Sequence, residues 1–172
     1  MTKAPDTPQE GHKFLEIYIA DHLAGSAAGT RRIRRLADAE RDGVDGPLLS
    51  ELASQIAQER QALQSVADAL GIRPQAYKQV ASRVLEFAGL AKLNGRLLRR
   101  SPLSSLVELE GMLMAVRGKL AGWETLRTVL DTPRVGPVDI DELIARNKRQ
   151  LEQLADAHAR AAQTALGPAQ AA

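Results

Sequence analysis

Residues Pro47 to Gly71 read PLLSELASQIAQERQALQSVADALG and carry the clearest structural pattern in the chain. Its apolar residues recur at alternating steps of three and four, the spacing of one face of an α-helix. The positions on this face are Leu49, Leu52, Ile56, Glu59, Leu63, Val66 and Leu70. Because all of these positions except Glu59 are apolar, the carboxylate of Glu59 is predicted to point into the core with them.

The same pattern extends to both sides of this stretch and predicts further helices. Pro47 and Pro102 suit the first turn of a helix, and Asp139 with Glu142 three residues later forms an acidic capping box. Glycine and proline turns end the helices. The expected helical ranges are 12–41, 47–71, a shorter 74–95, 102–131 and 139–165.

The composition favours a single all-α domain. The chain has 172 residues, of which 44% are hydrophobic, 26% charged and only 3% aromatic. It lacks the alternation of β-branched and aromatic residues that strands require, so no sheet is expected. Residues 12–165 are predicted to form one helical bundle domain, with disordered tails over 1–11 and 166–172.

Charge and cysteine content exclude several classes of protein. The chain has no cysteine and therefore no disulfide or thiolate metal site, and its formal charge is only +2. No segment has the composition of a secretory signal or the apolar length needed to cross a bilayer. A cytoplasmic protein without a membrane partner is expected. No phosphate loop, nucleophile elbow or zinc-protease motif occurs, which favours a non-enzymatic protein.

Two more polar groups interrupt apolar stripes in the later helices. Glu110 has apolar residues one turn before and after it, and His158 continues the stripe of Ile140, Asn147 and Leu154. If the last two helices turn near residue 135, Glu110 and His158 lie at the same height. Glu59, Glu110 and His158 are therefore predicted to converge in the core as a candidate metal site.

This arrangement resembles the ferritin-like family of four-helix bundles. The resemblance implies an antiparallel four-helix bundle with one additional shorter crossover helix. Family members with two metals use a Glu on each of two helices and a Glu-x-x-His pair on each of the others. Here only Glu59, Glu110 and His158 correspond to those ligands, while Ala62 and Ala155 stand where a His and a Glu are expected. The resemblance thus implies an incomplete, degenerate di-metal set.

A basic side chain offers an alternative to metal. Arg117 lies two turns after Glu110 among apolar residues, so its guanidinium is expected to neutralise the buried carboxylates as an ion pair. A smaller candidate polar site consists of Tyr18, Asp21 and His22, which cluster within about one helical turn. Gly25 and Gly29 follow them, and their small side chains either let helices approach or leave room between them.

The leading functional hypothesis is a non-catalytic or catalytically degenerate ferritin-like bundle that serves as an interaction or small-ligand-binding module. It needs no cofactor and self-associates through helix faces as a homodimer or higher oligomer. The first alternative is a metal-binding protein with one iron or manganese ion held by carboxylates and histidine. The second is a nucleic-acid-associated basic protein. Against it, the arginine run at 31–35 is followed by acidic residues and has no aromatic platform.

Overall fold

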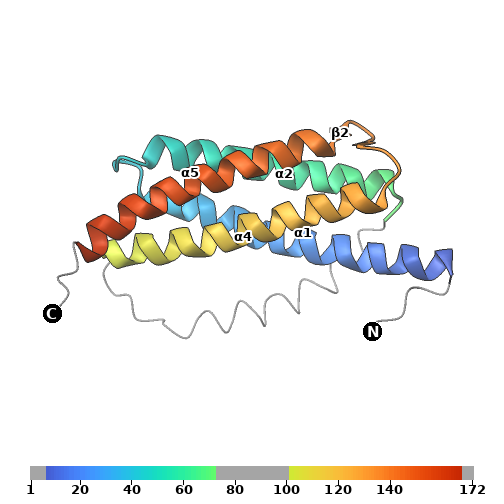
Figure 1. The fold of residues 1–172 in the computed structure, drawn as a ribbon, viewed down its shortest axis with the longest axis horizontal. Coiled ribbons are helices and arrows are strands. Elements are labelled where there is room, and N and C mark those ends of the chain that lie inside the picture. The colour runs from blue at the N-terminus through green and yellow to red at the C-terminus, as the bar shows by residue number, and fades with distance from the viewer. Residues whose placement is uncertain (1–6, 73–100, 168–172) are drawn as a thin grey trace.

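The computed structural model describes residues 7–72 and 101–167, which form four long helices and one small hairpin (Figure 1). The elements are α1 (Pro8–Ala39), α2 (Gly46–Ala69), α4 (Pro102–Val129), β1 (Arg134–Val135), β2 (Val138–Asp139) and α5 (Ile140–Leu166). The expected all-α bundle is confirmed. The predicted helix over 74–95 lies outside the described residues.

The helices pack as two antiparallel hairpins. Helix α1 packs against α2, α4 packs against α5, and α1 also contacts α4. Helices α2 and α4 run in the same direction, so the end of α2 and the start of α4 lie at opposite ends of the bundle (Figure 1). None of the helices that the structure describes is both long and apolar enough to span a membrane.

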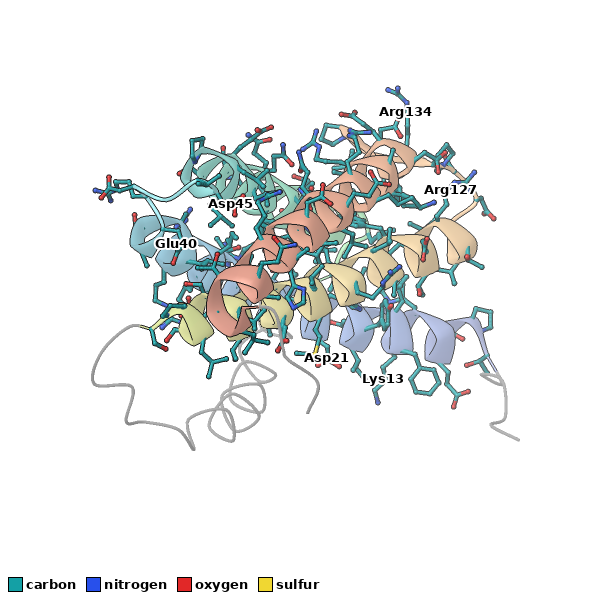
Figure 2. All side chains as sticks on the ribbon, turned by 60° about the vertical axis from the view of Figure 1, so that its left-hand side comes forward. Lys13, Asp21, Glu40, Asp45, Arg127 and Arg134 are labelled. Carbon is teal, nitrogen blue, oxygen red and sulfur yellow. The ribbon has the colours of Figure 1, made fainter. Side chains whose placement is uncertain are left out.

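The core consists of two apolar clusters stacked along the bundle. One cluster surrounds Trp123 and Ile140 near the β-hairpin, and the other surrounds Leu52 and Met112 toward the opposite end. Between them the bundle interior contains polar side chains, of which Glu59, Asn147 and Gln150 are at most 1% exposed. Charged side chains cover the outside, with Lys13 and Asp21 projecting from α1 (Figure 2).

Two local expectations were wrong. Helix α1 begins at Pro8 and not at residue 12, because Thr7 caps it by accepting a hydrogen bond from the backbone N–H of Glu10 at 3.2 Å. The expected absence of sheet fails between α4 and α5, where Val135 pairs with Val138. Gly136, with φ of +56°, permits the tight turn that joins the two short strands.

Candidate functional site: a buried ion pair beside a pocket

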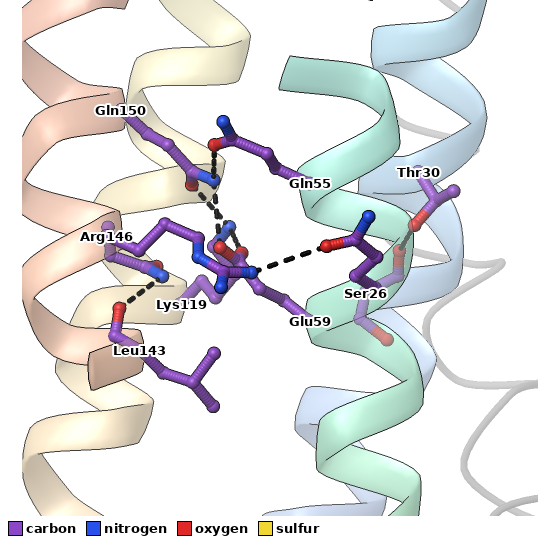
Figure 3. A network of polar contacts seen from close by, with 10 residues as sticks. Ser26, Thr30, Gln55, Glu59, Lys119, Leu143, Arg146 and Gln150 are labelled. Atoms are coloured by element: carbon purple, nitrogen blue, oxygen red, sulfur yellow. Dashed lines mark hydrogen bonds and ion pairs between the residues drawn. The ribbon is translucent and has the colours of Figure 1, made fainter. Parts of the chain in front are cut away.

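Glu59 points into the core, as the period of α2 predicts, and it meets a cation there. The Lys119 ammonium on α4 donates a hydrogen bond to Glu59 Oε2 and a second one to Gln150 Oε1 at 2.9 Å. The Glu59 side chain is fully buried, and that of Lys119 is 18% exposed. The pair therefore joins α2 to α4 in the interior of the bundle (Figure 3).

Gln150 of α5 completes this network. Its amide nitrogen donates to Glu59 Oε1 at 2.8 Å and to Gln55 Oε1 at 2.9 Å. Both carboxylate oxygens of Glu59 thus accept hydrogen bonds, which is the condition for burying a charge without a severe penalty. Burial lowers the pKa of the Lys119 ammonium below its ordinary value, while the adjacent Glu59 carboxylate acts in the opposite direction.

Glu110 lies on the outside of the bundle, contrary to the prediction. Helix α4 has two apolar stripes, and its core-facing stripe contains Leu109, Met112 and Val116. Glu110 belongs to the other stripe, with Val107 and Met114, whose side chains are exposed in the part of the chain that the structure describes. Glu110 does have apolar neighbours on its own face of α4, as predicted, but that face points away from the core.

His158 also lies at the margin of the core rather than inside it. The buried positions of α5 pass through Gln150 and Ala157, one residue away from the predicted Leu151 and His158. The imidazole Nε2 lies 3.4 Å from Glu110 Oε1, and the side chains of the two residues are 31% and 52% exposed. Their predicted proximity is confirmed, whereas their predicted burial is wrong.

The three predicted ligands do not converge. Glu59 contacts Lys119, which lies nine residues beyond Glu110 on α4, or roughly 13 Å along the helix axis at 1.5 Å per residue. Over residues 7–72 and 101–167, no group of three or more His, Cys, Asp or Glu side chains is placed to hold a metal ion. The predicted metal site required Glu59, Glu110 and His158 to lie together, and their positions contradict that requirement.

The cation that neutralises the buried acid is Lys119 and not Arg117. Arg117 is exposed, whereas Lys119 lies next to the buried stripe of Val116, Leu120 and Trp123. Lys119 is three residues after Val116 and four before Trp123, a spacing that places all three on neighbouring parts of one face. This spacing was the available signal, and it was missed because Arg117 also has apolar neighbours.

A cavity of about 340 Å³ lies beside the ion pair, between α1, α2 and α4. Lys119 and Glu59 both line it. Its walls are otherwise mainly apolar, with large side chains from Ile19, Ile56, Leu63, Met112, Val116 and Leu126. This volume lies within the range of small-molecule sites, which commonly combine apolar walls with a few polar groups.

The predicted cluster of Tyr18, Asp21 and His22 lies along this cavity. The Tyr18 and His22 rings contact each other with centroids 4.5 Å apart. Burial lowers the pKa of His22 below its ordinary value, and the neighbouring Asp21 carboxylate opposes the shift. The His22 ring packs over Gly122, where a Cβ atom would lie only 2.7 Å from His22 Cε1.

Glycines form part of the cavity lining. Gly25, Gly29 and Gly118 line it from helix interiors, and a Cβ atom added to any of them would meet no heavy atom within 4 Å in the described structure. Of the two roles predicted for Gly25 and Gly29, the structure therefore shows that of leaving room. Trp123 lines the cavity as well, and its buried Nε1–H has no hydrogen-bond partner among the described residues.

Comparisons of the chain with protein-family models, with curated proteins and with solved structures find no match.

Proposed function

We propose that this protein is a small-molecule-binding module whose pocket between α1, α2 and α4 holds a mainly apolar ligand. The observation that carries the proposal is a cavity of about 340 Å³ with apolar walls and one buried ion pair, Glu59 with Lys119, at its lining. Apolar walls supply affinity through burial, and a small number of fixed polar groups supplies orientation.

The glycines in the lining support a binding role for the cavity. A glycine inside a helix destabilises it by about 0.5–1 kcal/mol relative to alanine. Gly25, Gly29 and Gly118 incur this cost although alanine would fit sterically at each position. A bundle selected for stability alone would gain from alanine there, so the open volume itself is the feature that a binding function explains.

Of the ferritin-like resemblance, this proposal keeps only the arrangement of the helices. Two antiparallel hairpins, with α2 and α4 parallel, agree with the connection expected of that family. We infer a non-catalytic bundle in which the Lys119 ammonium occupies the position beside Glu59 that a metal ion would take. The cation neutralises the carboxylate without supplying redox or Lewis-acid chemistry.

The metal-binding alternative has less support from the geometry. The oxygens of Glu59 already accept hydrogen bonds from Lys119 and Gln150, and Glu110 with His158 forms a separate pair at the surface. Elemental analysis of the purified protein distinguishes the two hypotheses. Stoichiometric iron or manganese that is lost in His158→Ala would favour the metal hypothesis over the one proposed here.

Self-association and nucleic-acid binding stay predictions. A self-association interface would best fit the exposed apolar stripe on α4, which consists of Leu103, Val107 and Met114. The arginine run at 31–35 lies on α1, where Arg31, Arg34 and Arg35 are exposed. Neither feature identifies a partner, so neither is preferred to the pocket.

Binding of a small aromatic hydrocarbon tests the proposal. The chain has a single tryptophan, and it lines the pocket, so the Trp123 indole N–H gives one assignable signal in a ¹H–¹⁵N correlation spectrum. Titration with ethylbenzene should shift this signal in a saturable manner. An indole signal that stays in place up to the solubility limit of ethylbenzene would contradict the proposal.

A matched pair of variants shows whether binding occurs in the pocket. Gly29→Leu places a side chain where the structure has open space and should abolish the saturable shift. Arg31→Leu adds the same side chain to an exposed position of the same helix outside the lining and should bind like the wild type. Equal loss in both variants would point to a general effect of the added leucine.

A further inference from the structure

Lys119 has a hydrogen-bond donor left for a molecule in the pocket. An ammonium group carries three N–H bonds. Two of them are donated to Glu59 Oε2 and Gln150 Oε1, and in the described part of the chain the third has no protein partner. Since Lys119 lines the cavity and its side chain is 18% exposed, a ligand atom can approach this donor.

Glu59 offers much less to a ligand than Lys119 does. One of its oxygens accepts from Lys119 and the other from Gln150, and its side chain is fully buried. Gln150 is similarly occupied, because its amide nitrogen donates to both Glu59 and Gln55. The polar side of the pocket is therefore a donor, and the matching ligand atom is a hydrogen-bond acceptor.

The charge of the lining indicates which kind of acceptor fits. The lining holds two acidic groups, Asp21 and Glu59, and two basic groups, Arg60 and Lys119, whose formal charges cancel. The imidazole of His22 also lines the pocket, and burial lowers its pKa, which disfavours its charged form. A carboxylate bound beside Lys119 would lie close to Glu59 as well, and no surplus cation is present to neutralise it.

We propose that the ligand is an apolar molecule bearing one uncharged carbonyl oxygen. This oxygen accepts a hydrogen bond from Lys119 Nζ, while Glu59 remains the counter-ion of Lys119. This inference rests on the proposed function, because it assigns a ligand class to the same pocket. The bound state contains one cation, one anion and one neutral acceptor. It requires no change in protonation and leaves the network with Gln150 intact.

Acetophenone and ethylbenzene test this assignment because they share a phenyl ring and a two-carbon substituent and differ in the carbonyl group. Hydration of the ketone differs from that of the hydrocarbon, so the informative quantity is the change in their Kd ratio between two proteins. The second protein is Glu59→Leu/Lys119→Met, which removes the donor and its counter-ion together and leaves no stranded charge. The preference for acetophenone should fall about tenfold, the equivalent of one hydrogen bond of roughly 1.4 kcal/mol.

The matched control is Arg127→Gln/Asp141→Asn, which removes an exposed ion pair that also joins α4 to another helix, here α5. It should retain the wild-type ratio. A ratio that is unchanged in Glu59→Leu/Lys119→Met, with both probes still bound, would overturn the inference about the ligand and leave the binding function standing. Failure of both probes to bind the wild type would instead overturn the binding function.

Two measurements on the wild type do not depend on any variant. Acetophenone labelled with ¹³C at its carbonyl should, when bound, resonate downfield of its position in an apolar solvent, as expected for a carbonyl that accepts a hydrogen bond. Benzoate should bind at least tenfold more weakly than acetophenone. A bound carbonyl signal at its position in an apolar solvent, or benzoate binding as tight as that of acetophenone, would each contradict the assignment.

Discussion

Removing Lys119 alone should strand a buried carboxylate. In the variant Lys119→Met, Glu59 Oε2 loses its ammonium partner, while the fully buried carboxylate keeps only the amide of Gln150. Breaking a buried pair in this way typically destabilises a protein by about 3–5 kcal/mol. Lys119 is partly exposed, and water can enter the adjoining cavity, so we expect a loss near the lower end, about 3 kcal/mol.

Replacing both partners should cost much less. Glu59→Leu/Lys119→Met leaves no unpaired charge, and apolar replacement of a buried pair is often close to neutral. The double variant does remove the Lys119 donor of Gln150 Oε1, which limits the recovery. We expect the free energy of unfolding of the double variant to lie within about 2 kcal/mol of the wild-type value. It should be higher than the free energy of unfolding of Lys119→Met.

Urea unfolding at pH 7 and 10 °C, followed by circular dichroism, measures these free energies. The exposed pair of Arg127 with Asp141 is the control, and Arg127→Met should change stability by less than about 1 kcal/mol. A Lys119→Met variant that is as stable as Arg127→Met would contradict this prediction, because Glu59 would then be solvated in the folded protein.

Three further predictions concern single side chains. Gly118→Ala should stabilise the protein by about 0.5–1 kcal/mol, because its Cβ atom meets open space. Gly122→Ala should destabilise it, because its Cβ atom would clash with the His22 ring. Equal midpoints of thermal unfolding for the two variants would contradict this difference between the two lining positions. Folding depresses the pKa of His22, so the contribution of His22 to stability is constant above its unfolded pKa of about 6.5 and decreases as pH falls from there toward the folded pKa. Urea midpoints at pH 7.5 and 5.5 should therefore differ less in His22→Gln than in the wild type, while the exposed control His12→Gln should keep the wild-type difference. Thr7→Ala should lower the unfolding free energy by about 1 kcal/mol through loss of the α1 cap, and an unchanged urea midpoint would show that this end of α1 does not contribute to stability.

Most of the helical architecture could be predicted from the sequence because it depends on local periodicity. The apolar spacing of α2 correctly placed Glu59 inside, and the position of the α4–α5 turn correctly paired Glu110 with His158. The start of α1 was also encoded, since Thr7 followed by Glu10 is a capping signal. The prediction of a disordered tail over residues 1–11 overlooked this signal.

The polar centre could not be predicted in the same way, because a hydrophobic pattern assigns polar residues to the surface. Gln150 is fully buried only because Lys119, Glu59 and Gln55 satisfy its amide, and these partners come from two other helices. The sequence pattern favours Leu151 for that inward position. Burial of Gln150 is a property of the assembled network and not of α5 alone.

The pocket depends on a distance that composition does not specify. Gly25 and Gly29 on α1 are compatible with close helix packing and with an open space between helices. Which of these occurs depends on how the surrounding side chains pack in the assembled bundle. The glycines thus identify where a cavity is permitted, and the three-dimensional packing decides that it is present.

Crystals of the protein soaked with 4′-bromoacetophenone test the binding proposal most directly, because the bromine atom locates the bound ketone. A bromine anomalous peak should lie between α1 and α4, beside Gly25 and Gly118, with the ketone oxygen within hydrogen-bond distance of Lys119 Nζ. Bromine peaks confined to the outer surface, with the pocket filled by protein side chains, would contradict the proposal.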